Sequence, residues 1–405
     1  MSLGMQQTKI DRRTLLGLGF AATAAWTAER VTPPSPAPLA PVSIVRCRDY
    51  GSELKPALAL LFDGLGGLKR LVAGKTVAIK VNLTGGAREG FGGRSAGQTF
   101  QVHPSLVLAC CHALAAAGAR RVRLLEGWAG DLSADDFFRR CGWDLTALRA
   151  LPAKVEFENT NNRGSFRSYS HLKVRHRPYI FPSFELNRSY EECDLLVSLA
   201  KMKNHFHAGL TLTLKNFFGA TPIPFYGDDA GSEQSRGGRG SVLHKGTGKP
   251  APPAEPEVDP NSPRDDGYRV TRIPVDLVGA LPPISLSVID GIQTVQGGEG
   301  PWIKPLRVLD PHLLMAGLNP VCTDAVCAAA MGYDPLGEFG SPPFYRGDNS
   351  ISLAAQVGMG STDVSKIDVR GLSLPEARFS FEPGPHAWLS TGPVCIIQPA
   401  NGGGR

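Results

Sequence analysis

Short runs of β-branched residues alternate with helical patterns from Val42 onward. Of all features of the sequence, this alternation restricts the possible fold most strongly. Two of the helical segments, 104–117 and 320–331, begin with proline and end at a glycine, as helices commonly do. Strands separated by helices form βαβ units. The sequence therefore predicts an α/β fold, a mostly parallel sheet with helices on both faces. We expect the strands at 42–47, 76–81, 121–125, 154–158, 195–199, 286–290 and 313–317.

Composition limits the class of protein further. With 47 glycines and 33 prolines in 405 residues the fold is loop-rich, and 42% hydrophobic residues suffice for a buried core. A net charge of +6 without a basic run argues against nucleic acid and is compatible with an anionic small molecule. The eight cysteines include no C-x-x-C pair, so no iron–sulfur cluster is expected from this chain's own cysteines. One disulfide could form, but spacing does not identify its partners.

The N-terminus has the pattern of an export signal. Arg12 and Arg13 precede an uncharged, apolar stretch that is too short to span a bilayer, which is typical of a twin-arginine signal peptide over 1–28. A proline-rich linker over 29–41 follows. This pattern predicts recognition by the twin-arginine export machinery and a periplasmic location. An uncleaved membrane anchor and an ordinary amphipathic helix are the alternatives.

The rest of the chain, 42–400, reads as a single α/β domain with an insertion. Residues 222–263 hold eight prolines and seven glycines with few large apolar side chains. Long loops of this kind are either active-site lids or flexible filler, and composition does not separate the two. Residues 140–190 could form a second lobe of the same domain.

Polar side chains follow most of the predicted strands. Ligands of open α/β sheets bind beyond the carboxyl ends of the strands, so these side chains mark a candidate cleft. A glycine-rich loop at 85–97 lies among them, but it lacks the spacing of a dinucleotide- or phosphate-binding motif. The candidates are Lys80, Asn82, Glu126, Lys201, Lys203, His205, His207, Lys215, Asp290, Glu299 and Asp324.

Four lysines, Lys80, Lys201, Lys203 and Lys215, would meet at the mouth of this cleft. Clustered ammonium groups repel one another unless an anion or carboxylates neutralise them. The favoured interpretation is a bound carboxylate or phosphate. The competing interpretation is a set of structural salt bridges to Glu126, Asp290 and Asp324.

His205 and His207 are two residues apart, so on an extended segment they would share a face and could bind one metal ion. With Glu299 and Asp324 they would form a mixed imidazole and carboxylate site suited to zinc, iron, manganese or nickel. The alternative is that both histidines only make structural hydrogen bonds.

Several short motifs together resemble the bacterial and archaeal family known as domain of unknown function 362. The resemblance covers about residues 75–335 and implies an α/β domain whose activity is mostly unassigned. Some members have ferredoxin-like cysteine motifs, which this chain lacks. A more distant likeness to lactate racemases lies in His205-Phe206-His207-Ala208-Gly209 and Lys215. The family motifs are K-x-N-L at 80–83, K-x-K-x-H at 201–205, T-L-x-L-K-N-x-F-G at 211–219, D-G-I at 290–292, G-x-G-P at 298–301 and N-P-V-x-x-D at 319–324.

The sequence thus predicts an exported enzyme that acts on an anionic small molecule. Redox or isomerase chemistry is favoured over hydrolysis because neither a nucleophile elbow nor an H-E-x-x-H motif is present. The alternative is a non-catalytic periplasmic protein that binds a ligand or cofactor. The expected roles are catalysis by His205, Lys215 and Asp290, ligand or cofactor binding by Lys80, Asn82, Lys201, Lys203 and Asn216, and metal binding by His205, His207, Glu299 and Asp324.

Overall fold

The computed structural model describes residues 37–161 and 168–382, which belong to one compact unit. The predicted signal peptide and most of the proline-rich linker lie outside the described residues, so both stay predictions. In the part of the chain that is described, no helix is long and apolar enough to cross a membrane.

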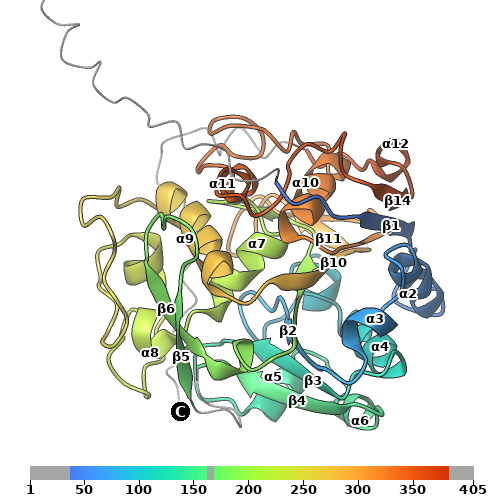
Figure 1. The fold of residues 1–405 in the computed structure, drawn as a ribbon, viewed down its shortest axis with the longest axis horizontal. Coiled ribbons are helices and arrows are strands. Elements are labelled where there is room, and N and C mark those ends of the chain that lie inside the picture. The colour runs from blue at the N-terminus through green and yellow to red at the C-terminus, as the bar shows by residue number, and fades with distance from the viewer. Residues whose placement is uncertain (1–36, 162–167, 383–405) are drawn as a thin grey trace, which may run out of the picture. The chain divides into compact units, whose positions relative to one another are not determined.

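An eight-stranded sheet forms the centre of this unit, and it confirms the predicted α/β class (Figure 1). Seven strands run parallel to one another, and only β13 runs the opposite way, between β1 and β10. Each of the seven strands predicted from the sequence is present, while the short edge strand β14 was not predicted. The strand order is β14 (Val369–Gly371), β1 (Val42–Arg46), β13 (Leu313–Gly317), β10 (Ile284–Gly291), β7 (Leu195–Lys201), β2 (Thr76–Lys80), β3 (Arg121–Glu126) and β4 (Lys154–Asn159).

Helices cover both faces of the sheet, because successive side chains along each strand point to opposite sides. In β2, Val77 and Ile79 pack into one hydrophobic core and Ala78 packs into the other. Figure 1 shows α2 to α4 on one side of β2 and β10, and α7 and α9 on the other. The first core contains α2 (Leu54–Asp63), α3 (Lys69–Val72), α4 (Pro104–Ala116), α5 (Ala134–Arg140) and α6 (Leu145–Arg149). The second contains α7 (Thr213–Asn216), α9 (Asp266–Ala280), α10 (Pro320–Ala330), α11 (Ser350–Gln356) and α12 (Leu374–Ala377).

Helix ends form where capping chemistry requires them. The Ser133 side chain accepts a hydrogen bond from the backbone N–H of Asp136 at the start of α5. Helix α10 begins with Pro320, and the Asn319 side chain caps it by accepting from the next two free backbone amides. Asn319 therefore holds a helix end, a role that asparagine fills as well as aspartate.

The insertion 222–263 is packed against the rest of the domain. It contains α8 (Ile223–Tyr226) and the single-turn π-helix η4 (Gly240–His244). Tyr226 and Leu243 are fully buried, and the Tyr226 hydroxyl accepts a hydrogen bond from the backbone of Glu185 at 3.0 Å. Glu185 belongs to the antiparallel hairpin β5 (Tyr169–Lys173) and β6 (Ser183–Asn187), which lies beside α8 (Figure 1). The segment therefore has a fixed structure despite its composition.

Two further two-stranded sheets position loops at the carboxyl edge of the main sheet. They are β8 (Asn204–His205) with β9 (Gly209–Leu210), and β11 (Thr294–Gln296) with β12 (Arg307–Leu309). Short 3-10 helices lie at η1 (Ala96–Gln98), η2 (Arg188–Tyr190) and η3 (Phe217–Ala220). The seven cysteines within the described residues are free thiols, and Cys110 and Cys111 are buried in α4.

Candidate active site

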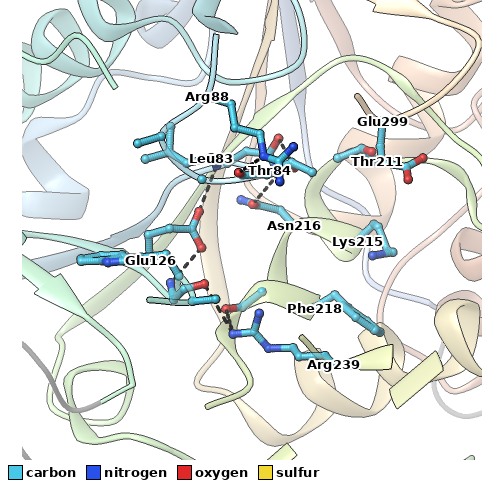
Figure 2. Close-up of a pocket in the computed structure, with 18 of the residues that line it drawn as sticks. Leu83, Thr84, Arg88, Glu126, Thr211, Lys215, Asn216, Phe218, Arg239 and Glu299 are labelled. Carbon is cyan, nitrogen blue, oxygen red and sulfur yellow. Dashed lines mark hydrogen bonds between the residues drawn. The ribbon is translucent and has the colours of Figure 1, made fainter. Parts of the chain in front are cut away.

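A cavity of about 650 Å³ lies at the carboxyl ends of β2 and β3. This volume fits a small molecule. Figure 2 shows its wall, with Lys215 and Asn216 across the cavity from Glu126, and Arg88 and Arg239 on the other two sides. Seven of the residues predicted from the sequence line it: Lys80, Asn82, Glu126, His205, Lys215, Asn216 and Glu299.

Lys80 and Glu126 form a buried ion pair at the ends of β2 and β3. Lys80 Nζ lies 2.7 Å from Glu126 Oε1 and also donates to the carbonyl oxygen of Val81. Glu126 accepts two backbone hydrogen bonds, from Leu83 and Gly127. Burial lowers the pKa of Lys80, and Glu126 opposes that shift. The competing interpretation, a structural salt bridge, therefore describes Lys80.

Asn216 joins two strands beneath the cavity. Its amide nitrogen donates to the carbonyl oxygen of Lys80 at 3.1 Å and to the Ser198 hydroxyl at 3.1 Å, and its side-chain oxygen accepts from Asn82 at 3.0 Å. These bonds fix the last turn of α7 against β2 and β7. The residue preceding Asn216, Lys215, is positioned by the same contacts.

Lys215 differs from the other three lysines. Among the described residues no hydrogen-bond or ion-pair partner lies against its ammonium group, which instead stands 3.9 Å from the centre of the Phe218 ring. Burial, with the positive charges of Arg239 and Lys80, lowers the pKa of Lys215 to about 7, although Glu299 opposes the shift. A partly exposed amine that titrates near neutral pH thus faces the cavity.

His205 lines the cavity and is buried. Its Nδ1 atom accepts backbone hydrogen bonds from His207 at 3.2 Å and Ala208 at 3.3 Å. Burial, together with the charge of Lys215, holds the pKa of His205 well below its ordinary value. The ring is therefore neutral with its proton on Nε2, which is available as a hydrogen-bond donor to a ligand.

Glu299 anchors the loop after β11 to the cavity wall. Its two carboxylate oxygens accept hydrogen bonds from the backbone of Phe206 at 2.9 Å and from the indole of Trp302 at 3.0 Å. The nearer oxygen lies 3.8 Å from His205 Nδ1. Glu299 thus connects this loop to the β8–β9 turn.

The cavity wall has an excess of positive charge. Lys80 and Glu126 neutralise each other, which leaves one carboxylate and three cationic side chains around the space. These are Glu299, Arg88, Lys215 and Arg239. Arg239 is held by the carbonyl oxygen of Thr221 at 2.8 Å, and Arg88 by that of Gly85 at 2.8 Å. An anionic ligand complements this charge.

Lys201 and Asp290 are not among the residues that line the cavity. They face each other in the register of β7 and β10, and their ion pair of 3.0 Å is fully buried. Asp290 also accepts from the Tyr50 hydroxyl at 2.7 Å and from the backbone of His103 at 3.0 Å. Through these hydrogen bonds Asp290 joins β10 to the segment before α4.

Lys203 and Asp324 are also placed in structural positions. Lys203 Nζ is fully buried and donates to the carbonyl oxygens of Phe100 and Glu299 and to the Thr84 hydroxyl. Asp324 accepts from the backbone amides of Thr213 and Leu214 at 2.8 and 2.9 Å, at the start of α7. Asp324 therefore positions the helix that carries Lys215, but it does not join the predicted metal set.

His207 belongs to a different cluster from the one predicted. Within residues 37–161 and 168–382, a single group of three histidine, cysteine or acidic side chains has ligand atoms within 4.8 Å of one another, and it comprises His207, His244 and Asp266. His205 and Glu299 stay on the cavity side.

The sequence reasoning missed Arg239 and His244, which reach the cavity from the insertion, and also Arg88 and Trp302. Arg239 and His244 do carry a signal, since basic and imidazole side chains stand out in a segment of small residues. The high glycine and proline content of that segment, however, is typical of a loop without functional side chains.

The fold is thus an α/β domain with a cavity at the carboxyl edge of its sheet. The chain belongs to the family described as domain of unknown function (DUF362), whose model matches residues 77–329. A curated relative is the thylakoid-associated protein sll1697 of Synechocystis, 25% identical over 300 residues that make up 73% of this chain and 75% of the relative.

Two solved structures are similar at low identity. One is a protein from Thermotoga maritima (15% identity, TM-score 0.34, 65% of this chain), and the other is the lactate racemase apoprotein from Thermoanaerobacterium thermosaccharolyticum (15% identity, TM-score 0.34, 67% of this chain). The chain spans 55% and 54% of the length of these two proteins.

Proposed function

We propose that this protein is an enzyme that binds a small carboxylate or similar anion in the cavity and transfers a proton with Lys215. The observation that carries the proposal is the position of Lys215, an amine at the cavity wall without a carboxylate partner among the described residues. Lys80 and Lys201, which have such partners, serve as the internal contrast.

Anion binding follows from the charges that remain after pairing. Lys215, Arg239 and Arg88 approach the cavity from three different segments, which would hold an anionic group from several sides. His205 Nε2–H adds a neutral donor that can stabilise negative charge developing on a substrate oxygen.

Proton transfer follows from the environment of Lys215. A general base or acid works best when its pKa is close to the working pH, and the pKa of Lys215 is lowered to about 7. Both the amine and the ammonium are then populated at neutral pH. This supports isomerase-type chemistry, in which a proton leaves and returns to a carbon next to a carboxylate, ahead of redox chemistry.

Solvent exchange tests this function without a known substrate. The purified protein is incubated in D₂O with a panel of 2-hydroxy carboxylates and their phosphorylated counterparts, each of which carries a hydrogen on the carbon next to the carboxylate. We expect incorporation of deuterium next to the carboxylate of at least one compound. We expect Lys215→Met to reduce the rate by at least ~100-fold, because general acid–base catalysis contributes about 10²–10⁴. The surface variant Lys69→Met is the matched control and should exchange like wild type.

Calorimetry on the same compounds separates the two functions considered. Binding that depends on Lys215, without deuterium exchange for any bound compound, would contradict the enzyme and support a non-catalytic binding protein. Binding that is unchanged in Lys215→Met would contradict both.

We also propose export of the mature domain through a twin-arginine signal. The Arg12-Arg13 pair ahead of an apolar stretch supports this location. Replacing both arginines with lysine should leave the protein in the cytoplasmic fraction. An unchanged periplasmic fraction would contradict the proposal.

A further inference from the structure

A second cluster of chemically active side chains lies at the border of the cavity. His207 is in the turn between β8 and β9, His244 is in η4 of the insertion, and Asp266 is in the first turn of α9. Each offers one ligand atom, and these atoms lie within 4.8 Å of one another. We propose that these three residues bind a divalent transition metal ion of the zinc type. This proposal goes beyond the proton-transfer function and does not depend on it.

The distances in the cluster are close to those of a metal site. His244 Nδ1 lies 2.9 Å and His207 Nε2 lies 4.0 Å from the same oxygen, Oδ1 of Asp266. Zinc bonds to nitrogen and oxygen are about 2.0–2.2 Å long, so ligand atoms around one ion stand ~3.3 Å apart in tetrahedral geometry. A small rotation of the His207 ring and of the carboxylate would bring all three atoms to that spacing.

The donor set determines the class of ion. Two imidazole nitrogens and one carboxylate oxygen suit zinc and other first-row transition metals, whereas magnesium and calcium require mostly oxygen ligands. A site with three protein ligands also leaves at least one position for water or a substrate group. The exposed fractions of the side chains are 17% for His207, 28% for His244 and 26% for Asp266, so an ion could enter from solvent.

Aromatic side chains hold the two imidazole rings in place. Phe206 packs edge-on against His207 with ring centres 4.8 Å apart, and Phe218 packs edge-on against His244 at 5.3 Å. The two imidazoles stand almost perpendicular, at 83°, with ring centres 6.0 Å apart. Fixed rings that direct nitrogen atoms toward one carboxylate reduce the cost of ordering the ligands.

The location links the ion to the cavity. His244 and Phe218 both line the cavity as well as touching the cluster, and the Phe218 ring also lies under Lys215. A divalent ion balanced by one carboxylate would carry a net positive charge, which would add to the attraction for an anionic ligand. The insertion 222–263 would then supply a metal ligand, a role that its glycine and proline content does not suggest.

Metal titration of the untagged full chain tests the site. After treatment with a chelator, we expect one equivalent of Zn²⁺ by calorimetry and visible absorption bands of tetrahedral Co²⁺. His207→Ala, His244→Ala and Asp266→Asn should each weaken Zn²⁺ binding by more than about tenfold, since loss even of outer-shell partners costs 10–100-fold. His112→Ala, which changes an exposed histidine on α4, is the matched control and should bind like wild type.

The outcomes separate this site from the proton-transfer site. Asp266→Asn keeps the shape of the side chain, and a melting curve of the metal-free variants shows whether each one folds. Zn²⁺ density between the three residues in soaked crystals, with unchanged Zn²⁺ affinity in Lys215→Met, would support the proposal. Absence of stoichiometric Zn²⁺ binding in wild type, or wild-type affinity in folded Asp266→Asn, would overturn it whatever the result of the exchange assay.

Discussion

The lysines beneath the glycine-rich loop and the lysine on α7 show two uses of the same side chain. Lys201 and Lys203 are fully buried, and each is surrounded by acceptors: Asp290 and a carbonyl oxygen for Lys201, two carbonyls and a hydroxyl for Lys203. Lys215 has the Phe218 ring and the cavity in place of acceptors. Burial lowers the pKa of all three, but of these three lysines only Lys215 lines the cavity. The presence or absence of hydrogen-bond acceptors around the ammonium group therefore distinguishes the structural lysines, Lys201 and Lys203, from the lysine at the cavity, Lys215.

Breaking the ion pair between Lys201 and Asp290 should have the largest effect on stability. Asp290→Ala leaves Lys201 as a buried charge without its carboxylate, which typically costs about 3–5 kcal/mol. We expect the urea midpoint of unfolding to fall accordingly. Lys215→Met removes a half-buried charge that has no carboxylate partner among the described residues, so it should leave stability unchanged or raise it. A larger loss of stability in Lys215→Met than in Asp290→Ala would contradict the division between the two regions.

The pH dependence of stability should show the same contrast between Lys215 and the paired lysines. The pKa of Lys215 is lowered from 10.5 to about 7 in the folded state, so the unfolded chain binds more protons between these values. Stability should therefore gain a contribution from Lys215 as pH rises from about 7 toward 10, relative to its value at lower pH. Subtracting the unfolding curves of Lys215→Met from those of wild type isolates this contribution. A difference that stays flat across this range would show that Lys215 titrates normally.

The fold was easier to predict from the sequence than the roles within the site. Strands such as β2 and β7 are runs of β-branched and leucine residues bounded by polar ones, and these local patterns fixed their positions. The edge strand β14, Val369–Gly371, is three residues long and partly exposed, so it carries little hydrophobic signal. Proximity to the strand ends was enough to find Lys80 and Lys215, whereas Asn216 was found only through the family motif at 211–219.

Which lysine is paired could not be predicted, because pairing depends on strand order. Lys201 meets Asp290 only because β7 and β10 are neighbours in the sheet with those residues in register, although they are 89 positions apart in the chain. Asp324 caps α7 through a contact across 111 positions. His207 likewise turns toward Asp266 and away from the predicted metal set, a choice made by the β8–β9 turn.

The smallest predicted effects come from the charges around Lys215, and they have opposite signs. Glu299 raises the pKa of Lys215 while Arg239 lowers it. Glu299→Gln should therefore shift the titration of Lys215 to lower pH, and Arg239→Met should shift it to higher pH. Competitive labelling of the amine in the ligand-free protein, followed by mass spectrometry, measures both shifts with exposed Lys69 as the internal reference.

Shifts of opposite sign in the two variants are not expected if Glu299 and Arg239 have no electrostatic effect on Lys215. If Lys215 were exposed to bulk solvent in solution, screening would reduce both shifts to nothing and its labelling would follow that of Lys69. If burial alone lowered the pKa of Lys215, either variant could change this pKa only by loosening the cavity. Loosening reduces burial, so both variants would then shift the titration toward higher pH. Shifts of opposite sign would show that Glu299 and Arg239 act in opposite directions on the charge of Lys215, which is the arrangement that the proposed proton transfer at neutral pH requires.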